Sequence, residues 1–159
     1  MYSSGLRISE AINIKFKDID SERKTIHIEK PKNGYARYAD LSEKNLKQLR
    51  KYYKIYWKKS FENYNKENYI FCTYKKDVPI TSKSVRKELK KVAKRAGINK
   101  ELTPHSLRHS IAVHMLESGI DLISIQRFLG HKSISSTCIY LQLANIKKLG
   151  CKNPFDNEF

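Results

Sequence analysis

The chain has 159 residues, with 32 Lys and Arg against 16 Asp and Glu, which gives a formal net charge of +16. This length suits one domain with a hydrophobic core, and 40% apolar residues are typical of a folded chain and exclude a disordered one. So basic a domain favours a polyanionic partner, with nucleic acid as the leading expectation and an anionic membrane surface as the alternative. The sequence has no run of about 18 apolar residues and no signal peptide, so we expect an intracellular protein that does not enter a membrane.

Metal and redox chemistry are not predicted. Cys72, Cys138 and Cys151 are odd in number and lack C-x-x-C spacing, which favours reduced thiols over a disulfide framework or a zinc site. The sequence also lacks an acidic cluster for magnesium, an H-E-x-x-H pair and a P-loop. We therefore expect no metal and no cofactor.

A helix is predicted at the start of the chain. Ser3 or Ser4 is expected to cap it, which places Arg7 in its first turn, where a guanidinium and a helix N-terminus together favour phosphate. Glu10 lies one turn after Arg7 and is expected to hold its side chain. The apolar side of this helix is expected from Leu6, Ile8, Ile12 and Ile14.

A β-hairpin is predicted next, because residues 24–41 alternate with period two around a turn at 31–34. Lys30 and Lys32 stand at its tip and Arg37 on the returning strand. A lysine at a hairpin tip is commonly a solvated charge; the alternative is an arm that reaches a nucleic-acid groove and donates a proton there. Residues 69–71 predict a short strand that adds a third member to this sheet.

Two basic amphipathic helices are predicted in the middle of the chain. The first runs from a cap at Ser42 to about Phe61, and the second is expected to be capped by Ser82 or Ser84 and to end near Gly97. The residues expected to face inward are Leu46, Leu49, Tyr53 and Trp57 in the first helix and Val85, Leu89, Val92, Ala93 and Ala96 in the second.

The outward side chains of these helices favour contact with a nucleic-acid backbone, because few acidic residues lie between the basic ones. Solvation alone is the alternative explanation of such a face. Together with Lys30 and Arg37 of the hairpin, the expected DNA-binding residues are Lys47, Arg50, Lys54, Lys83, Arg86, Lys87 and Lys90.

Residues 103–140 carry most of a candidate active site. Thr103 is expected to cap a helix that begins with Pro104, and His105 and Arg108 then lie one turn apart on the same side. His109 and His114 have no partner at helical spacing, and we interpret them as structural or surface histidines. All of these residues belong to T-P-H-S-L-R-H-S and the apolar helix that follows it.

The end of this stretch adds two further polar side chains. Asp121 is expected to cap a helix that Gly130 ends, which places His131 at a turn. Ser135 or Ser136 begins a last helix that carries Tyr140. A site built from Arg, His, Lys and Tyr neutralises phosphate charge with side chains in place of a metal.

The motifs S-S-G-L-R-I-S-E, P-H-S-L-R-H-S and L-G-H-K-S, the hairpin lysine and the late Tyr140 resemble the catalytic domain of the tyrosine recombinase (phage integrase) family. The resemblance holds in order and spacing from Arg7 to Tyr140. It implies a mainly α (α+β) fold: a helical catalytic domain with a small antiparallel β-sheet at one edge. It also implies cutting and rejoining of DNA without metal or ATP.

The resemblance also implies a role for each site residue. Arg7 and Arg108 match the two arginines that clamp the scissile phosphate. Glu10 matches the acidic position that supports the first arginine, Arg7. Tyr140 matches the nucleophile that forms a 3′-phosphotyrosyl link. Lys32 matches the lysine that donates a proton to the leaving 5′ oxygen, with Lys30 as the alternative. His105 matches the histidine that assists proton transfer. His131 matches the His/Trp position that bonds a phosphate oxygen.

The family's usual organisation gives further expectations. We expect a catalytic domain at residues 1–145 and a tail at 146–159, with the N-terminal helices and the core-binding domain of the family absent. The partner implied is double-stranded DNA, on which the protein forms a homotetramer. Without DNA we expect a monomer or weak oligomer. The implied location is the cytoplasm, in association with the nucleoid. The alternatives are a type IB topoisomerase and a catalytically silent DNA-binding fragment.

Overall fold

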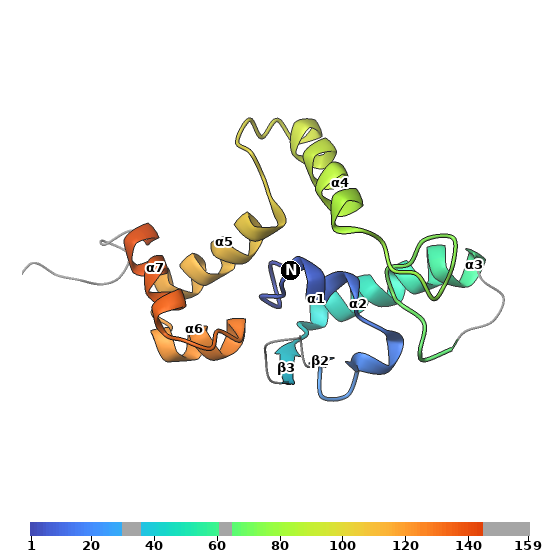
Figure 1. Ribbon diagram of the computed structural model, residues 1–159, viewed down its shortest axis with the longest axis horizontal. Coiled ribbons are helices and arrows are strands. Elements are labelled where there is room, and N and C mark those ends of the chain that lie inside the picture. Colours follow the sequence, from blue (N-terminus) through green and yellow to red (C-terminus); the bar gives the residue numbers. More distant parts are fainter. Residues whose placement is uncertain (30–35, 61–64, 145–159) are drawn as a thin grey trace, which may run out of the picture.

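The computed structural model describes residues 1–29, 36–60 and 65–144, and these form a mainly helical fold with a small antiparallel sheet at one edge, as the sequence predicts (Figure 1). Lys30, Lys32 and the tail from 146 lie outside the described residues. The elements in chain order are α1 (Ile8–Ile12), the 3-10 helix η1 (Phe16–Asp18), β1 (Ile19–Asp20), β2 (Thr25–Ile28), β3 (Arg37–Asp40), α2 (Glu43–Tyr52), the π-helix η2 (Tyr53–Trp57), α3 (Lys58–Ser60), α4 (Ser82–Arg95), α5 (Pro104–Glu117), α6 (Leu122–Leu129) and α7 (Ser135–Leu143).

The sheet has the order β1-β2-β3, with both neighbouring pairs antiparallel. The predicted hairpin is confirmed, with Ile26 opposite Ala39. The third strand is not the predicted 69–71, because Tyr69 makes only an isolated bridge to Lys15. Instead β1 pairs with β2 across the short turn at 21–24, and so short a connection closes at a smaller entropic cost than a distant segment does.

The first helix begins later than the sequence predicts. Gly5 has a φ of +58°, so the chain is not helical there, and neither Ser3 nor Ser4 caps α1. Arg7 instead occupies the N-cap position in an extended conformation, and its backbone N–H donates to the Glu10 carboxylate at 2.7 Å. Arg7 therefore lies at the entrance of α1 and not within its first turn.

The first basic helix is interrupted. Ser42 caps α2 as predicted, its Oγ accepting from the N–H of Asn45 at 3.3 Å. From Tyr53 the helix widens into the π-helical η2, which ends at the buried Trp57. The Trp57 ring packs edge-on against Phe16 at 4.9 Å between centroids, so this widened turn is anchored in the core.

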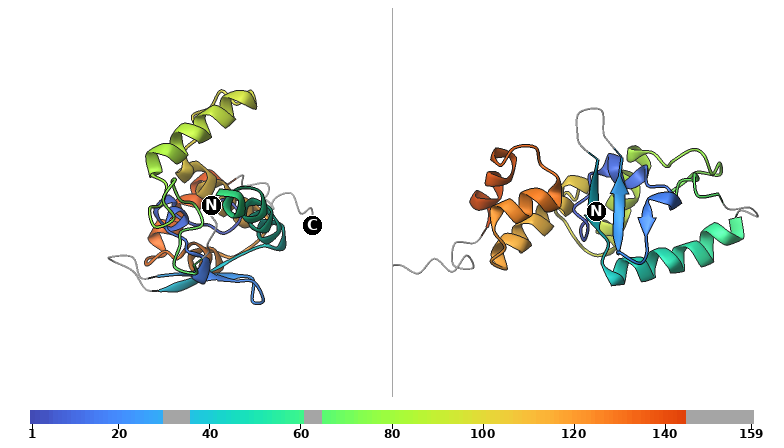
Figure 2. Two further views of the ribbon diagram at one scale, coloured as in Figure 1. Left: turned by 90° about the vertical axis from the view of Figure 1, so that its right-hand side faces the viewer. Right: turned by 90° about the horizontal axis from the view of Figure 1, so that it is seen from below.

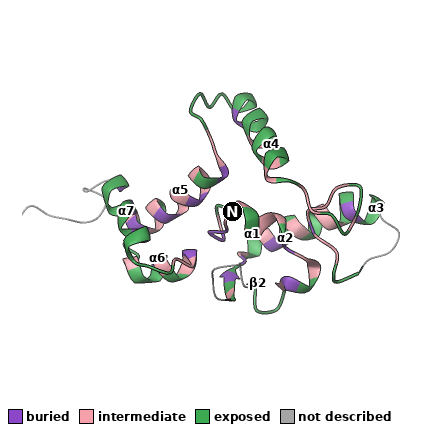
Figure 3. Ribbon diagram, in the orientation of Figure 1, coloured by how far each residue is buried: buried purple, intermediate pink, exposed green. Residues whose placement is uncertain are grey.

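The second basic helix, α4, stands away from the rest of the molecule (Figure 3). Thr81 caps it, and neither Ser82 nor Ser84 does so. Ala93 is buried as predicted, but Val92 is 56% exposed and Ala96 is also exposed, because α4 touches its neighbours along one narrow side only.

The hydrophobic residues form two separate clusters. One lies between the sheet, α1 and α2 and includes Leu6, Ile26 and Leu46. The other joins α5, α6 and α7 through residues such as Ile125 and Leu129. Figure 2 shows these two halves on opposite sides of the N-terminal segment, which therefore runs along the boundary between them.

The caps of the second half follow the sequence closely. Thr103 caps α5 with Pro104 as its first residue, Asp121 caps α6, and Gly130 ends α6 with a φ of +65°.

No helix in the described part of the chain combines the length and the apolar character that a membrane crossing requires.

Candidate active site

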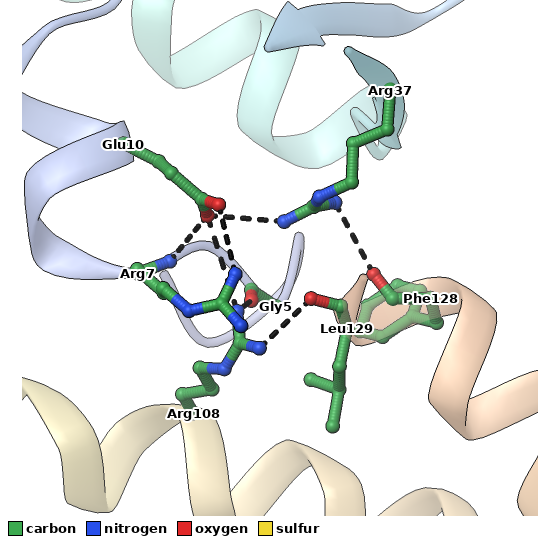
Figure 4. A network of polar contacts seen from close by, with 7 residues as sticks. All are labelled: Gly5, Arg7, Glu10, Arg37, Arg108, Phe128 and Leu129. Carbon is green, nitrogen blue, oxygen red and sulfur yellow. Dashed lines mark hydrogen bonds and ion pairs between the residues drawn. The ribbon is translucent and has the colours of Figure 1, made fainter. Parts of the chain in front are cut away.

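The two predicted arginines meet at the boundary between the halves, where Arg7 from the N-terminal segment faces Arg108 from α5 (Figure 4). Gly5 makes this close approach possible. A Cβ at Gly5 would lie 2.6 Å from a ring carbon of Phe128, so only glycine lets the N-terminal segment pack this closely on α6.

Arg108 is held rigidly, with only 2% of its surface exposed. Its Nη1 donates to the Gly5 carbonyl and its Nη2 to the Leu129 carbonyl at 2.8 Å. Burial, together with the positive charge of Arg7, lowers the pKa of Arg108 to about 10. The guanidinium therefore stays charged at neutral pH, fixed by carbonyl groups from both halves of the molecule.

Glu10 is the single carboxylate of this cluster. Its oxygens accept from the Arg7 guanidinium at 3.1 Å and from the Arg37 guanidinium at 3.0 Å, and lie 3.9 Å from that of Arg108 (Figure 4). Three guanidinium groups against one carboxylate leave two positive charges in excess. Such an excess, presented by planar donors, suits a phosphate diester.

The accessible part of this cluster is Arg7. Its side chain is 39% exposed, whereas that of Arg37 is 16% exposed. An anion arriving from solvent therefore meets Arg7 first, with Arg108 behind it. The expectation that Glu10 supports Arg7 agrees with the two hydrogen bonds between them.

Tyr140 lies on α7 and is only 1% exposed. Its hydroxyl shares a hydrogen bond of 3.2 Å with Nδ1 of His109. Burial raises the pKa of the Tyr140 phenol, and the positive charges of Arg108 and Arg7 partly oppose that rise. The nucleophile expected from the sequence thus lies within electrostatic reach of both arginines.

His131 follows α6 and stacks on Tyr140, with the ring planes 12° apart and the centroids 6.3 Å apart. Its Nδ1 shares a hydrogen bond of 2.9 Å with the buried Thr137 hydroxyl, which fixes the ring. Burial first, and then the charge of Arg108, lower the pKa of His131 to about 4. His131 is therefore neutral at physiological pH.

The structure adds one residue that the sequence interpretation missed, His109. It lies four residues after His105, and their ring centroids are 5.2 Å apart. The interpretation of His109 as a histidine without a partner was therefore wrong, since the spacing that places residues i and i+4 on one helix face applies to these two. His105 itself is exposed at the outer side of this pair. His114 bonds Tyr2 instead, at 2.7 Å.

The residues expected to bind DNA separate into two groups. Those of α2 and η2 and those of α4 are exposed: Lys47, Arg50, Lys54, Lys83, Arg86, Lys87 and Lys90. Arg37 differs, because its guanidinium turns inward to Glu10 and to the Phe128 carbonyl, at 3.4 Å. It is therefore not placed as an outer DNA contact.

Among the described residues, no group of three His, Cys, Asp or Glu side chains could hold a metal ion.

Comparison with known proteins gives a consistent result. A model of the phage integrase family matches residues 1–146. The chain is 39% identical over 155 residues to the putative integrase/recombinase y4qK of Sinorhizobium fredii, which takes in 98% of this chain and 48% of that protein. It is 35% identical over 147 residues to the tyrosine recombinase XerA of Pyrococcus horikoshii, which takes in 90% of this chain and 48% of that protein. The chain thus spans about half the length of these curated relatives.

Solved structures agree with the fold. The crystal structure of XerA recombinase superposes with a TM-score of 0.79 at 30% identity, over 94% of this chain and 52% of that one. The post-cleavage complex of XerH site-specific recombinase with a palindromic difH substrate superposes with a TM-score of 0.76 at 28% identity, over 91% of this chain and 40% of that one. The predicted fold class, a mainly helical domain with a small antiparallel sheet, is confirmed.

Proposed function

Because this chain belongs to the phage integrase family, we propose that it forms the catalytic domain of a site-specific DNA recombinase that cuts and rejoins DNA through a 3′-phosphotyrosyl link. The observation that supports this most directly is the buried Tyr140 phenol beside an arginine cluster with an excess of positive charge. A phenol that attacks a phosphodiester needs its charge neutralised, and these arginines provide that without a metal ion.

The proposed reaction assigns one role to each group. The Tyr140 oxygen attacks phosphorus while Arg7 and Arg108 bind the nonbridging oxygens. His131, which is neutral, offers a hydrogen bond to one of those oxygens, and His105 assists proton transfer from the exposed side. The leaving 5′ oxygen takes a proton from Lys32, a role carried over from the family pattern. The phosphotyrosyl link conserves the bond energy, so rejoining needs no ATP.

Double-stranded DNA is the proposed partner, with the exposed lysines and arginines of α2 and α4 along its backbone. A homotetramer on two duplexes, and a monomer or weak oligomer without DNA, follow from the family pattern. The division into a catalytic domain at 1–145 and a tail at 146–159 also follows from the family pattern, as does association with the nucleoid. The relatives named above are recombinases or integrases, so none of them favours a type IB topoisomerase.

A covalent-capture experiment tests this function. Duplexes carrying a nick and randomised flanking sequence are incubated with the protein, so that the short fragment released on cleavage diffuses away and the adduct persists. We expect a protein–DNA adduct that survives denaturation, and sequencing of the captured DNA identifies the preferred site. Tyr140→Phe should abolish the adduct. Tyr2→Phe is the matched control, because Tyr2 is a second tyrosine whose hydroxyl bonds a histidine of α5.

Two outcomes would overturn the proposal. If the wild-type protein forms no adduct with any DNA of the pool, the alternative of a catalytically silent DNA-binding fragment is favoured. An adduct that persists in Tyr140→Phe places the nucleophile elsewhere. A DNA with two captured sites then separates recombination from strand passage, because only a recombinase exchanges the flanking sequences.

A further inference from the structure

His109 and Tyr140 form a polar pair at the centre of the proposed reaction. Their contact joins α5 to α7 at 3.2 Å, and the ring centroids lie 5.5 Å apart. Within residues 1–29, 36–60 and 65–144, no other hydrogen bond to the Tyr140 hydroxyl is present. In the tautomer of His109 that carries its proton on Nε2, Nδ1 accepts the hydroxyl proton of Tyr140.

The surroundings of His109 keep its ring neutral. Burial lowers the pKa of His109, and the charges of His105 and Arg108 lower it further. A neutral imidazole retains a lone pair on Nδ1, which a hydrogen-bond acceptor and a base both need. The titratable groups around His109 are His105 and Arg108 from its own helix, Tyr140 from α7 and His131, which follows α6.

The other two histidines of the site are less well placed for this role. His131 stacks parallel to the Tyr140 ring and uses its Nδ1 on Thr137, and its strongly lowered pKa makes it a poor base. His105 is exposed, and its described ring contact is with His109. This arrangement suits His105 for passing a proton between His109 and solvent.

Building on the proposed function, we infer that His109 is the general base that takes the Tyr140 hydroxyl proton during cleavage. As the bond from Tyr140 Oη to phosphorus forms and the bond from phosphorus to the 5′ oxygen breaks, the proton moves to Nδ1 of His109. The leaving 5′ oxygen takes its proton from a separate donor, for which Lys32 is proposed. In rejoining, the imidazolium returns its proton to the departing Tyr140 oxygen.

This role makes α5 carry two functions on adjacent residues. Arg108 points into the boundary and binds the phosphate, while His109 points along the helix toward α7 and contacts the nucleophile. One rigid helix therefore fixes the distance between the phosphate-binding group and the base. Such fixed geometry is what proton transfer in a transition state requires.

The test uses single-turnover adduct formation on the captured DNA with three variants. His109→Ala removes both the hydrogen bond and the base, and we expect the rate to fall by about 100-fold or more, the usual contribution of general base catalysis. His109→Asn keeps an acceptor oxygen near the position of Nδ1 but cannot take a proton, so it should stay as slow as His109→Ala. The matched control is His114→Ala, on the same helix and with the same kind of tyrosine contact, which should react like wild type.

The pH profile separates a base from a structural residue. The deficit of His109→Ala should shrink as the pH rises toward 10, because solvent hydroxide then removes the phenol proton. A deficit that is constant with pH, or full recovery in His109→Asn, would show that His109 only positions Tyr140 and would overturn the inference. Wild-type rates in His109→Ala would overturn it as well.

Failure of the inference and failure of the proposed function give different results. If the wild-type protein forms no adduct, the recombinase proposal fails and this inference fails with it. If the wild-type protein reacts and His109→Ala reacts equally fast, only the inference fails. A nitrogen NMR spectrum of the imidazoles gives an independent readout, and a proton bound to Nδ1 of His109 would contradict the proposed direction of the hydrogen bond.

Discussion

The Arg37 guanidinium lies 3.0 Å from the Glu10 carboxylate and, through its other terminal nitrogen, 3.4 Å from the Phe128 carbonyl (Figure 4). These contacts join β3, α1 and α6, which belong to the two separate hydrophobic clusters. The hydrogen bond from Arg37 to Phe128 therefore links the two halves of the molecule, and the ion pair with Glu10 holds Arg37 near the place where Arg7 and Arg108 meet. A close contact at Gly130 completes this link, because a Cβ there would overlap the Arg37 guanidinium.

Removing the Glu10 charge should destabilise the protein strongly. Glu10→Gln leaves the guanidinium groups of Arg7, Arg37 and Arg108 without a counter-charge, and an uncompensated buried charge costs about 3–5 kcal/mol. We expect a matching fall in the free energy of unfolding, measured by urea denaturation at pH 7. Phosphate or sulfate should restore part of the loss, because an anion replaces the missing charge.

The control for this prediction is Glu43→Gln, which breaks an exposed pair with Lys24 and should leave the urea midpoint nearly unchanged. Equal effects of the two substitutions would show that the cluster around Glu10 is solvated like an ordinary surface pair.

Two glycines with positive φ test the close approach at the boundary. Gly97→Ala meets no atom within 4 Å and adds only the strain of a left-handed backbone, about 1–2 kcal/mol. Gly5→Ala adds the same strain and also overlaps the Phe128 ring, so it should cost more in urea denaturation. It should also lower adduct formation, because the Gly5 carbonyl that holds Arg108 must move. A Gly5→Ala protein as stable as Gly97→Ala would contradict the tight packing of the N-terminal segment on α6.

Local sequence signals predicted the parts of the structure that local chemistry decides. The caps at Ser42, Thr103 and Asp121 and the presence of the hairpin follow from residue type and spacing within a few positions. The inward turn of Arg37 does not, because its partners come from α1 and α6, far away in the sequence.

Other differences have a similar origin. Val92 fits an amphipathic pattern, but its exposure depends on how little of α4 its neighbours cover. The late start of α1 follows from the backbone of Gly5, which the packing against Phe128 imposes. His109 is the exception, since its spacing from His105 was present in the sequence and only its contact with Tyr140 required the fold.

The lowered pKa of His131 predicts a pH dependence of stability. The folded pKa of about 4 lies below the ordinary value of 6.5, so between these values the unfolded chain binds a proton that the folded chain does not. The stabilising contribution of neutral His131 is therefore complete above pH 6.5 and is lost as the pH falls toward 4. Urea denaturation from pH 7 to pH 4 should show this decline, and His131→Gln should reduce its slope. An NMR titration of His131 with a midpoint near 6.5 would contradict the burial of its ring.

DNA binding through α4 should depend steeply on salt. Each lysine or arginine that contacts a phosphate adds about 0.9 to the slope of log affinity against log salt concentration. Replacing Lys83, Arg86, Lys87 and Lys90 by alanine should therefore lower the slope for a nonspecific duplex by up to about 3.6, in fluorescence anisotropy at several salt concentrations.

A variant that removes Lys15 and Lys17 is the appropriate control for α4, because both already pair with Glu67. It should change the slope little. An equal loss of slope per charge removed in the two variants would mean that net charge alone attracts DNA. A slope unchanged by the α4 substitutions would remove this helix from the DNA-binding surface. The expected difference arises because the four α4 side chains stand in solvent on a helix that projects from the molecule, where a duplex can reach them together.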